Sequence, residues 1–517
     1  MMRKENIKEQ TKHWLFYAAV FFCFFALYAA TAQRGVSWQD SGEFQYRILA
    51  GDYHWHSGIA RAHPLYILMA RGFTLLFPKA AYFYAVNLFS GTGLALALAL
   101  LAYNVLQMTR SAWAAVTAVS VLGFAHMAWW MGTLAEVYTW SLAFLMAEIL
   151  CLIRYSETRD ARWLVALFGV NGAHFGIHNA ALLGLPVYAF LLASEAWRRR
   201  GRRAALVGGC AAIWLLGGGM IAWQAACLLK ETGHPLLVVK SVLFGDGYER
   251  HVLGTGGFAY KIWAVNMALA GLSLVNPAWL FAGRVLFLRA EEGQRELWSW
   301  LRVLTVLHGV FWVRYFVPDQ ATFVLPTLGL LAVWVGLGVG RSSFVGYCEW
   351  SKTQKRRVAV HVAMLAAGVA CAVVAPRLAC EIAQRSGWAT ARSRSLPFRD
   401  EATYWVLPWK QQETSAARFV EAVKKQLGPG DVLLADSTAA GPLLAAREAG
   451  LWANGWRLVT PWSGETDREV LDLVRDGARK VYVVSPVAGY APRSLLEAGC
   501  LFEPQGVVYR AKTRDVH

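Results

Sequence analysis

Long apolar stretches recur down this 517-residue chain, and they constrain its fold more than any other feature. A helical stretch of roughly 18 or more apolar residues matches the hydrocarbon thickness of a bilayer. Hydrophobic residues make up 56% of the chain and charged residues only 16%, against roughly 25% charged in an average soluble domain. The sequence therefore predicts a mainly α, polytopic membrane protein.

About eleven membrane spans are expected from the positions of these stretches. They cover residues 14–31, 83–107, 111–131, 134–153, 162–176, 178–195, 204–228, 261–288, 302–317, 321–340 and 358–378.

Basic residues gather in the short segments between spans, as in Arg198–Arg200 and Lys355–Arg357. The positive-inside rule assigns such clusters to the cytoplasm. The basic N-terminus is then inside, and the last span delivers residues 379–517 to the outside. Loop placement thus accounts for the net charge of +17, and we expect no nucleic-acid partner.

The stretch from Trp163 to Trp197 is short for two full spans, although basic residues flank both of its ends. Its middle, residues 171–179, is polar and broken by glycine. We expect two short helices that meet at a polar tip, because broken backbone at membrane depth needs cover from protein or a wet cavity.

The C-terminal region has a different pattern. Short strands are expected at 432–435, 458–460, 480–484 and 507–509, with helical runs at 439–449, 466–476 and 492–499. Such alternation predicts a small α/β domain with a largely parallel sheet. The chain therefore divides into a transmembrane domain, residues 1–378, and an extracytoplasmic α/β domain, residues 379–517. Cys380 and Cys500 both lie in the second, either as a disulfide or as two free thiols.

Two carboxylates, Asp40 and Glu43, lie in the first outside loop and share a face if that segment is helical. In one interpretation Asp40 caps the helix and Glu43 completes a capping box. In the other, a carboxylate just outside the first span acts as a general base. Spacing alone does not separate these interpretations.

Arg61 and His63 follow in the same loop, and both suit a phosphate group. Guanidinium binds phosphate through two parallel hydrogen bonds, and an imidazole donates a third. The alternative is an arginine at the headgroup level and a helix-capping histidine. Pro64 is expected in the first turn of the next helix.

Glu136 and Tyr138 occupy the next outside tip, beside a tryptophan pair, Trp129–Trp130, that fits an interfacial belt. A glutamate at the mouth of a span is a candidate site residue. The alternative is an acid that stabilises the helix N-terminus.

Three further candidates, His174, His178 and Asn179, occupy the polar tip described above. They suit donor phosphate or sugar hydroxyls. A four-residue spacing aligns two imidazoles for zinc, but no glutamate of an HExxH motif lies between them. We expect no metal ion.

Arg314 lies within an apolar span, where it is either a phosphate partner or an arginine that extends to the outer edge. Asp319 follows in the next outside tip, as a loop cap or a ligand of sugar hydroxyls.

As a set, these motifs resemble the GT-C superfamily of membrane glycosyltransferases. More narrowly, they resemble the transmembrane O-mannosyltransferase family of animals and its bacterial relatives. The resemblance covers residues 30–200 and is carried by Trp38–Phe44, Ala62–Pro64, Asn87–Ser90, Ala135–Tyr138 and the histidine-containing tip after Gly169. That family often continues His-Pro with Pro-Gly-Tyr-Pro, whereas Leu65 and Tyr66 follow here.

The resemblance implies an integral membrane enzyme that moves a sugar from a polyprenyl-phosphate carrier to a hydroxyl of a protein, glycan or lipid. Mannose is the best precedent, and transfer would be metal-independent and inverting, on the extracytoplasmic face of a bacterial cytoplasmic membrane. Asp40 would be the general base, with Glu43 as the second candidate. No cofactor is expected beyond the lipid-linked donor.

Two other interpretations share this architecture. A transporter or flippase would also be polytopic, but the chain has no inverted repeat. A membrane scaffold would bind its partners through residues 379–517.

Overall fold

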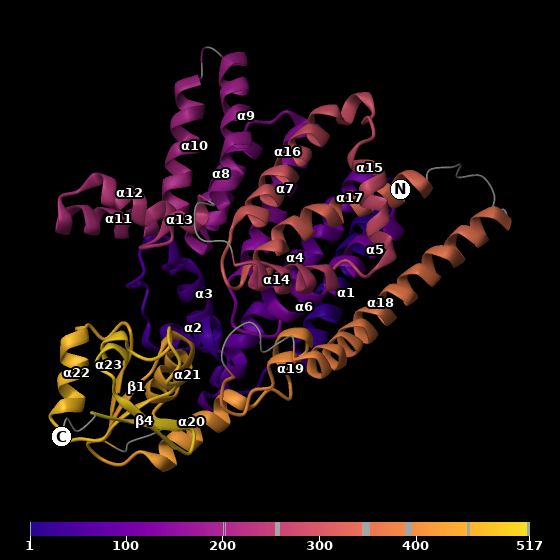
Figure 1. Ribbon diagram of the computed structural model, residues 1–517. Coiled ribbons are helices and arrows are strands. Elements are labelled where there is room, and N and C mark those ends of the chain that lie inside the picture. The colour runs from indigo at the N-terminus through magenta and orange to yellow at the C-terminus, as the bar shows by residue number, and fades with distance from the viewer. Residues whose placement is uncertain are drawn as a thin grey trace.

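The computed structural model describes residues 2–199, 201, 203–253, 259–343, 352–387, 395–451 and 455–513. Helices dominate, and a small sheet lies near the C-terminus (Figure 1). The helices up to the sheet region are α1 (Met2–Thr31), α2 (Gln39–Ala50), α3 (Pro64–Thr74), α4 (Tyr82–Thr109), α5 (Ala112–Gly123), α6 (His126–Met131), α7 (Tyr138–Thr158), α8 (Arg162–Ile177), α9 (Leu185–Arg198), α10 (Arg203–Gly217), α11 (Gly219–Thr232), α12 (Pro235–Phe244), α13 (Glu249–Val252), α14 (Tyr260–Leu272), α15 (Leu280–Leu286), α16 (Arg295–Arg314), α17 (Leu325–Ser343), α18 (Lys352–Ser386) and α19 (Glu401–Val406).

Five helical segments in the described part of the chain are long and apolar enough to cross a membrane: His13–Thr31, Lys79–Thr109, Tyr138–Thr158, Gln320–Arg341 and Val362–Ser386. Two further pairs, α10 with α11 and α14 with Pro277–Leu286, bend by 79° and 93°, which gives up to seven spans if each pair is one span. A helical membrane protein is thus confirmed. The count of eleven stays a prediction, because it includes α8 and α9, which are shorter than a full span.

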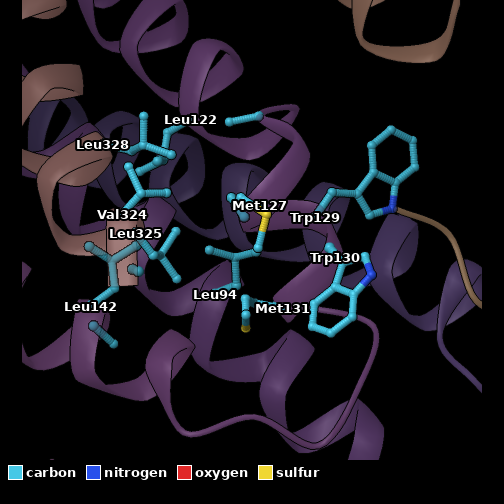
Figure 2. Packing of buried hydrophobic residues seen from close by; sticks show 14 of the residues in the cluster. Leu94, Leu122, Met127, Trp129, Trp130, Met131, Leu142, Val324, Leu325 and Leu328 are labelled. Atoms are coloured by element: carbon cyan, nitrogen blue, oxygen red, sulfur yellow. The ribbon is translucent and has the colours of Figure 1, made fainter. Parts of the chain in front are cut away.

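The centre of the helical part is built from α4, α5, α7 and α17. Figure 2 shows Leu94 of α4, Leu122 of α5, Leu142 of α7 and Leu328 of α17 in one cluster of buried side chains. Close helix approach supports this packing: a Cβ on Gly336 would lie 2.5 Å from Val105 Cγ1. Small residues at such contacts are how helices pack within a bilayer, where apolar burial alone gives no preference for a neighbour.

The expected break between α8 and α9 is present. His178 is extended, and a 3-10 turn, η3 (Asn179–Leu183), joins it to α9. Asn171 and His174, expected at the polar tip itself, instead lie within α8 before the break, and both are buried. The break thus separates one residue that faces a cavity, His178, from two that face neighbouring helices.

The C-terminal sheet has the order β2-β1-β3-β5-β4. Strands β1 (Val432–Leu434), β2 (Arg457–Val459) and β3 (Val481–Val483) pair in parallel, whereas β5 (Val508–Lys512) is antiparallel to β3 and to β4 (Leu501–Gln505). The helices around it are α20 (Ser415–Gln426), α21 (Ser437–Glu448), α22 (Asp467–Arg475) and α23 (Arg493–Glu497). The α/β pattern is confirmed, with one strand, β4, that the sequence did not predict.

The α/β part packs against the helical part through α21, which lies beside α2 (Figure 1). The predicted domain boundary at residue 379 falls inside α18 and stays a prediction. Cys380 and Cys500 are both free thiols.

Candidate functional site

Two cavities meet where the first loop, α7, and the segments before α13 and α17 converge. The leucine-lined cavity, of about 260 Å³, is bordered on one side by Leu182, Leu183, Leu243 and Phe244. The aromatic cavity, of about 230 Å³, is bordered by Trp38, Trp130, Tyr404 and Trp405. They share a common wall of Asp40, Arg61, Glu136, Tyr138, Tyr248, Tyr315 and Phe323.

Asp40 is not a helix cap. Helix α2 begins at Gln39, its N-cap is Trp38, and no side chain caps it, so the capping-box interpretation is wrong. Gln39 has a φ of 54°, a left-handed conformation that is uncommon for a residue with a side chain. Asp40 follows in the first turn, exposed, and borders both cavities.

Glu43 borders the leucine-lined cavity, Glu136 lies on the common wall, and both carboxyls are buried. Burial, reinforced by the negative charge of Asp40, raises the pKa of Glu43 to about 8. Arg47 is 3.8 Å away, too far to hydrogen-bond, so its attraction does not offset burial. Burial likewise raises the pKa of Glu136 well above its usual range, although Ser41 donates to it at 2.7 Å. Burial thus favours the protonated form of both carboxyls.

Arg61 ends a 3-10 turn, η1 (Ile59–Arg61), and donates a hydrogen bond to the hydroxyl of Tyr248 at 3.1 Å. Its guanidinium also lies over the Tyr248 ring, 4.8 Å from the centroid. Among the described residues that line the two cavities, Arg61 is the only arginine or lysine. It is thus the main positive charge that a ligand there would meet.

The imidazoles of His63 and His178 stack in the leucine-lined cavity, with centroids 5.2 Å apart. His63 has a φ of 48° and stands before Pro64, which begins α3 as predicted. His63 is at the N-cap, but its side chain caps nothing: Nδ1 pairs with the carbonyl of Ile177 at 2.8 Å, so Nδ1 carries a proton. His178 Nδ1 instead accepts from the amide of Ala180 at 3.0 Å. In the neutral imidazole its Nε2 therefore carries the proton and is a donor.

Asn179 and Asp319 also line the site. Asn179 borders the leucine-lined cavity and donates to the carbonyl of Leu243 at 3.2 Å, which links η3 to α12. Asp319 borders the aromatic cavity. It stands at the N-cap of a 3-10 turn, η7 (Gln320–Val324), but makes no side-chain cap.

Two predicted site residues line neither of these cavities. His174 is buried between Ser141, at 2.7 Å from Nε2, and Glu148, at 2.9 Å from Nδ1. Tyr188 donates to the other oxygen of Glu148 at 2.8 Å, so this network joins helices. Arg314 is exposed at the end of α16. Within the described part of the chain, no three histidine, cysteine or acidic residues are grouped to hold a metal ion.

Sequence reasoning missed most of the aromatic wall, including Tyr248, Tyr315, Phe323 and Trp405. Aromatic residues near span ends are typical of membrane interfaces, so their presence alone did not point to a cavity. Trp130 was assigned to such a belt, yet its ring stacks on Trp405 at 5.5 Å and 10°.

Residues 40–201 match the family model described as the Protein O-mannosyl-transferase TMEM260 N-terminal domain. The whole chain is similar to crystal structures of ArnT from Cupriavidus metallidurans. In complex with undecaprenyl phosphate, ArnT has 12% identity and a TM-score of 0.53, and the match covers 98% of this chain and 99% of that chain. The apo state has 13% identity and a TM-score of 0.53, with 97% and 98% covered. This chain has the GT-C fold.

The GT-C fold and the family match together support a membrane glycosyltransferase of the GT-C type. The family match begins at Asp40 and includes every cavity-lining candidate up to Asn179. The GT-C likeness extends over the α/β part as well, since nearly the whole chain is covered.

Proposed function

We propose that this protein transfers a sugar from a polyprenyl-phosphate carrier to an acceptor hydroxyl, with Asp40 as the general base. The observation that carries the proposal is the junction of the two cavities at Asp40 and Arg61. A base and a phosphate-binding cation then face one space, which is the arrangement that sugar transfer from a phosphate requires.

The carrier occupies the leucine-lined cavity. Leu182, Leu183 and Leu243 offer apolar contact to an isoprenoid chain, while Arg61 and the Nε2 proton of His178 face its phosphate. The ArnT structure contains undecaprenyl phosphate, which supports this class of carrier. Burial raises the pKa of Glu43 and of Glu136 and so favours their uncharged forms, which do not repel the phosphate.

The sugar and the acceptor meet in the aromatic cavity. Aromatic faces carry partial negative charge and attract the C–H groups of a sugar ring, and Asp319 accepts from hydroxyls. Asp40 takes the proton of the acceptor hydroxyl. That oxygen forms a bond to the anomeric carbon, the bond from this carbon to the phosphate oxygen breaks, and the phosphate leaves with the electron pair. Attack opposite the leaving group inverts the anomeric centre.

Among Asp40, Glu43 and Glu136, Asp40 is the best candidate for the base, because a base must be ionised and reachable. It is exposed and borders both cavities, whereas Glu43 and Glu136 are buried, and their burial raises the pKa of each and favours the protonated form. We further propose mannose as the first sugar to test, and transfer on the extracytoplasmic face of a bacterial cytoplasmic membrane, as the charge pattern predicts.

The test is sugar transfer by purified protein in lipid nanodiscs, with radiolabelled polyprenyl-phosphate sugars as donors and membrane extract as acceptor. Asp40→Asn is compared with wild type and with Asp52→Asn, a carboxylate of the same loop that lines neither cavity. Transfer by wild type and Asp52→Asn, with loss of roughly 10²-fold or more in Asp40→Asn, is expected.

Equal transfer by all three proteins would exclude Asp40 as the base. No transfer from any donor, with carrier lipid still bound, would favour a transporter over an enzyme.

A further inference from the structure

The helix that presents Asp40 and Glu43 is held from the C-terminal side of the chain at three points. The first is a backbone contact between Gly42 of α2 and Gly441 of α21. A Cβ on Gly441 would lie 2.7 Å from the carbonyl oxygen of Gln39 and 2.8 Å from the amide nitrogen of Glu43. These neighbours are backbone atoms that cannot rotate away, so only glycine permits this approach of the two helices.

The second point is the residue at the N-cap of α2. The indole Nε1 of Trp38 donates to the hydroxyl of Ser415 at 2.7 Å, and both side chains are buried. The Trp38 ring also packs against Phe419 of α20, with centroids 5.1 Å apart. A buried indole N–H without this partner would be costly, so the bond fixes where α2 begins.

The third point is Gln39, the residue directly before Asp40. Arg399 donates to its side-chain oxygen at 3.4 Å. Arg399 is itself buried and held by two hydrogen bonds to Glu401, of 2.6 and 2.8 Å. Gln39 has a left-handed backbone, a conformation that persists where its surroundings impose it.

The first loop faces the end of the sheet that lies beyond the carboxyl ends of the parallel strands. Open α/β sheets usually bind their ligands at that end. At this end of the sheet, the chain passes from β1 into α21, and from β2 into the segment that contains Trp462. The Trp462 ring packs on Trp55 and His56 of the first loop, at 5.1 and 4.8 Å. Helix α2 of the first loop thus packs beside α21 at this end of the sheet (Figure 1).

We propose that the C-terminal α/β part is a positioning element of the active site, which fixes α2 so that Asp40 faces the junction of the two cavities. This inference rests on the proposed function for Asp40. Gly441, Ser415 and Arg399 line neither of the two cavities and act through α2.

Gly441→Ala is the first test, with Gly428→Ala as the matched control. The nearest atom to a Cβ on Gly428 is 3.8 Å away, so that change is accommodated in the same part of the chain. Gly441→Ala is expected to lower kcat by about tenfold or more with the donor KM within about twofold, because small misplacements of a catalytic group cost up to about 10²-fold. Hydrogen exchange of the α2 amides is expected to rise in Gly441→Ala alone.

Ser415→Ala and Ser415→Thr form a second, milder pair. Alanine removes the acceptor of the Trp38 indole and is expected to lower kcat about fivefold, whereas threonine keeps the hydroxyl and restores it. If Gly441→Ala fails to fold, as judged by size-exclusion chromatography, the Ser415 pair tests whether the α/β part positions α2.

Three results would overturn the inference: equal kcat in Gly441→Ala and Gly428→Ala, unchanged α2 exchange, or a rise in acceptor KM with kcat unchanged. The last would make the α/β part an acceptor-recognition module. Wild type that transfers no sugar would instead defeat the proposed function, while hydrogen exchange would still test whether α21 holds α2.

Discussion

The guanidinium of Arg61 and the hydroxyl of Tyr248 are 3.1 Å apart, and both side chains border both cavities. The pair joins the first loop to the segment between α12 and α13, which the sequence separates by 187 positions. Tyr248 thus orients the only arginine or lysine among the described cavity-lining residues, and a ligand phosphate would meet a preorganised guanidinium.

Arg61→Ala is expected to raise the donor KM by about 10- to 100-fold, since a hydrogen bond to a charged group contributes about 1.5–3 kcal/mol. Tyr248→Phe keeps the ring and loses only the hydroxyl, so a rise of about threefold is expected. Steady-state transfer with a synthetic polyprenyl-phosphate sugar measures both values. An unchanged donor KM in Arg61→Ala would remove Arg61 from the phosphate site.

The raised pKa of the buried Glu43 carboxyl predicts that the stability of the protein depends on pH. This pKa is raised from the ordinary 4.5 to about 8, so the folded protein holds this proton more tightly than the unfolded chain. The stabilisation is complete below the ordinary value and is lost as pH rises toward 8. Glu43→Gln does not titrate there, so the unfolding temperature of wild type is expected to fall relative to this variant between about pH 5 and 8.

Differential scanning fluorimetry in nanodiscs measures that difference, with Glu421→Gln, an exposed glutamate of α20, as control. Parallel curves for wild type and Glu43→Gln would show that Glu43 is already ionised at neutral pH.

The position of Trp405 in the aromatic cavity predicts that its replacement changes the KM for the acceptor. Trp405 lines the aromatic cavity only, stacks on Trp130, and donates through Nε1 to Glu401 at 3.1 Å. Trp405→Ala is expected to raise the acceptor KM about tenfold and leave the donor KM unchanged, and Trp405→Phe to fall between. Trp409→Ala is the matched control, because Trp409 lines neither cavity. Equal effects of the two alanine variants would indicate loss of packing alone.

Alanine variants of His174 and Arg314, which line neither cavity, test whether these side chains contribute to stability or to donor binding. His174→Ala removes one hydrogen-bond partner of the buried Glu148 carboxyl, which keeps Asn171 and Tyr188, and the imidazole partner of Ser141, so a loss of about 1–3 kcal/mol in stability is expected. Arg314→Ala is expected to change stability by less than about 0.5 kcal/mol. Neither is expected to alter the donor KM, measured on folded protein. A raised donor KM in Arg314→Ala would restore it as a phosphate partner.

Several features followed from local sequence. Span-length hydropathy marked α1, α4, α7, α17 and α18, because a bilayer dictates both length and composition. Strand β4 was missed because Leu501–Gln505 contains Glu503, Pro504 and Gln505 and lacks apolar alternation. It pairs only with β5, at the edge of the sheet, where proline is tolerated.

For the candidate site, the sequence indicated polar residues at span ends but not which of them meet. Asp40 and Arg61 lie in one loop, whereas Tyr248 and Trp405 join them only through the tertiary fold. His174 was misplaced because the spacing of His174 and His178 does not reveal that α8 ends between them. The Gly42–Gly441 contact leaves no periodic signal at all.

The hydrogen bond between Trp38 and Ser415 spans 377 residues and therefore imposes an order on biosynthesis. At a synthesis rate of about 5–20 residues per second, Ser415 follows Trp38 by on the order of 20–75 s. In the last part of that interval, after Phe323 and before Ser415, the nascent chain contains all the residues of the leucine-lined cavity but lacks the hydrogen-bond partner of Trp38. Under the proposed function, such an unfinished chain would hold a lipid-linked sugar without a positioned base, and synthesis of the C-terminal α/β part would complete the active site.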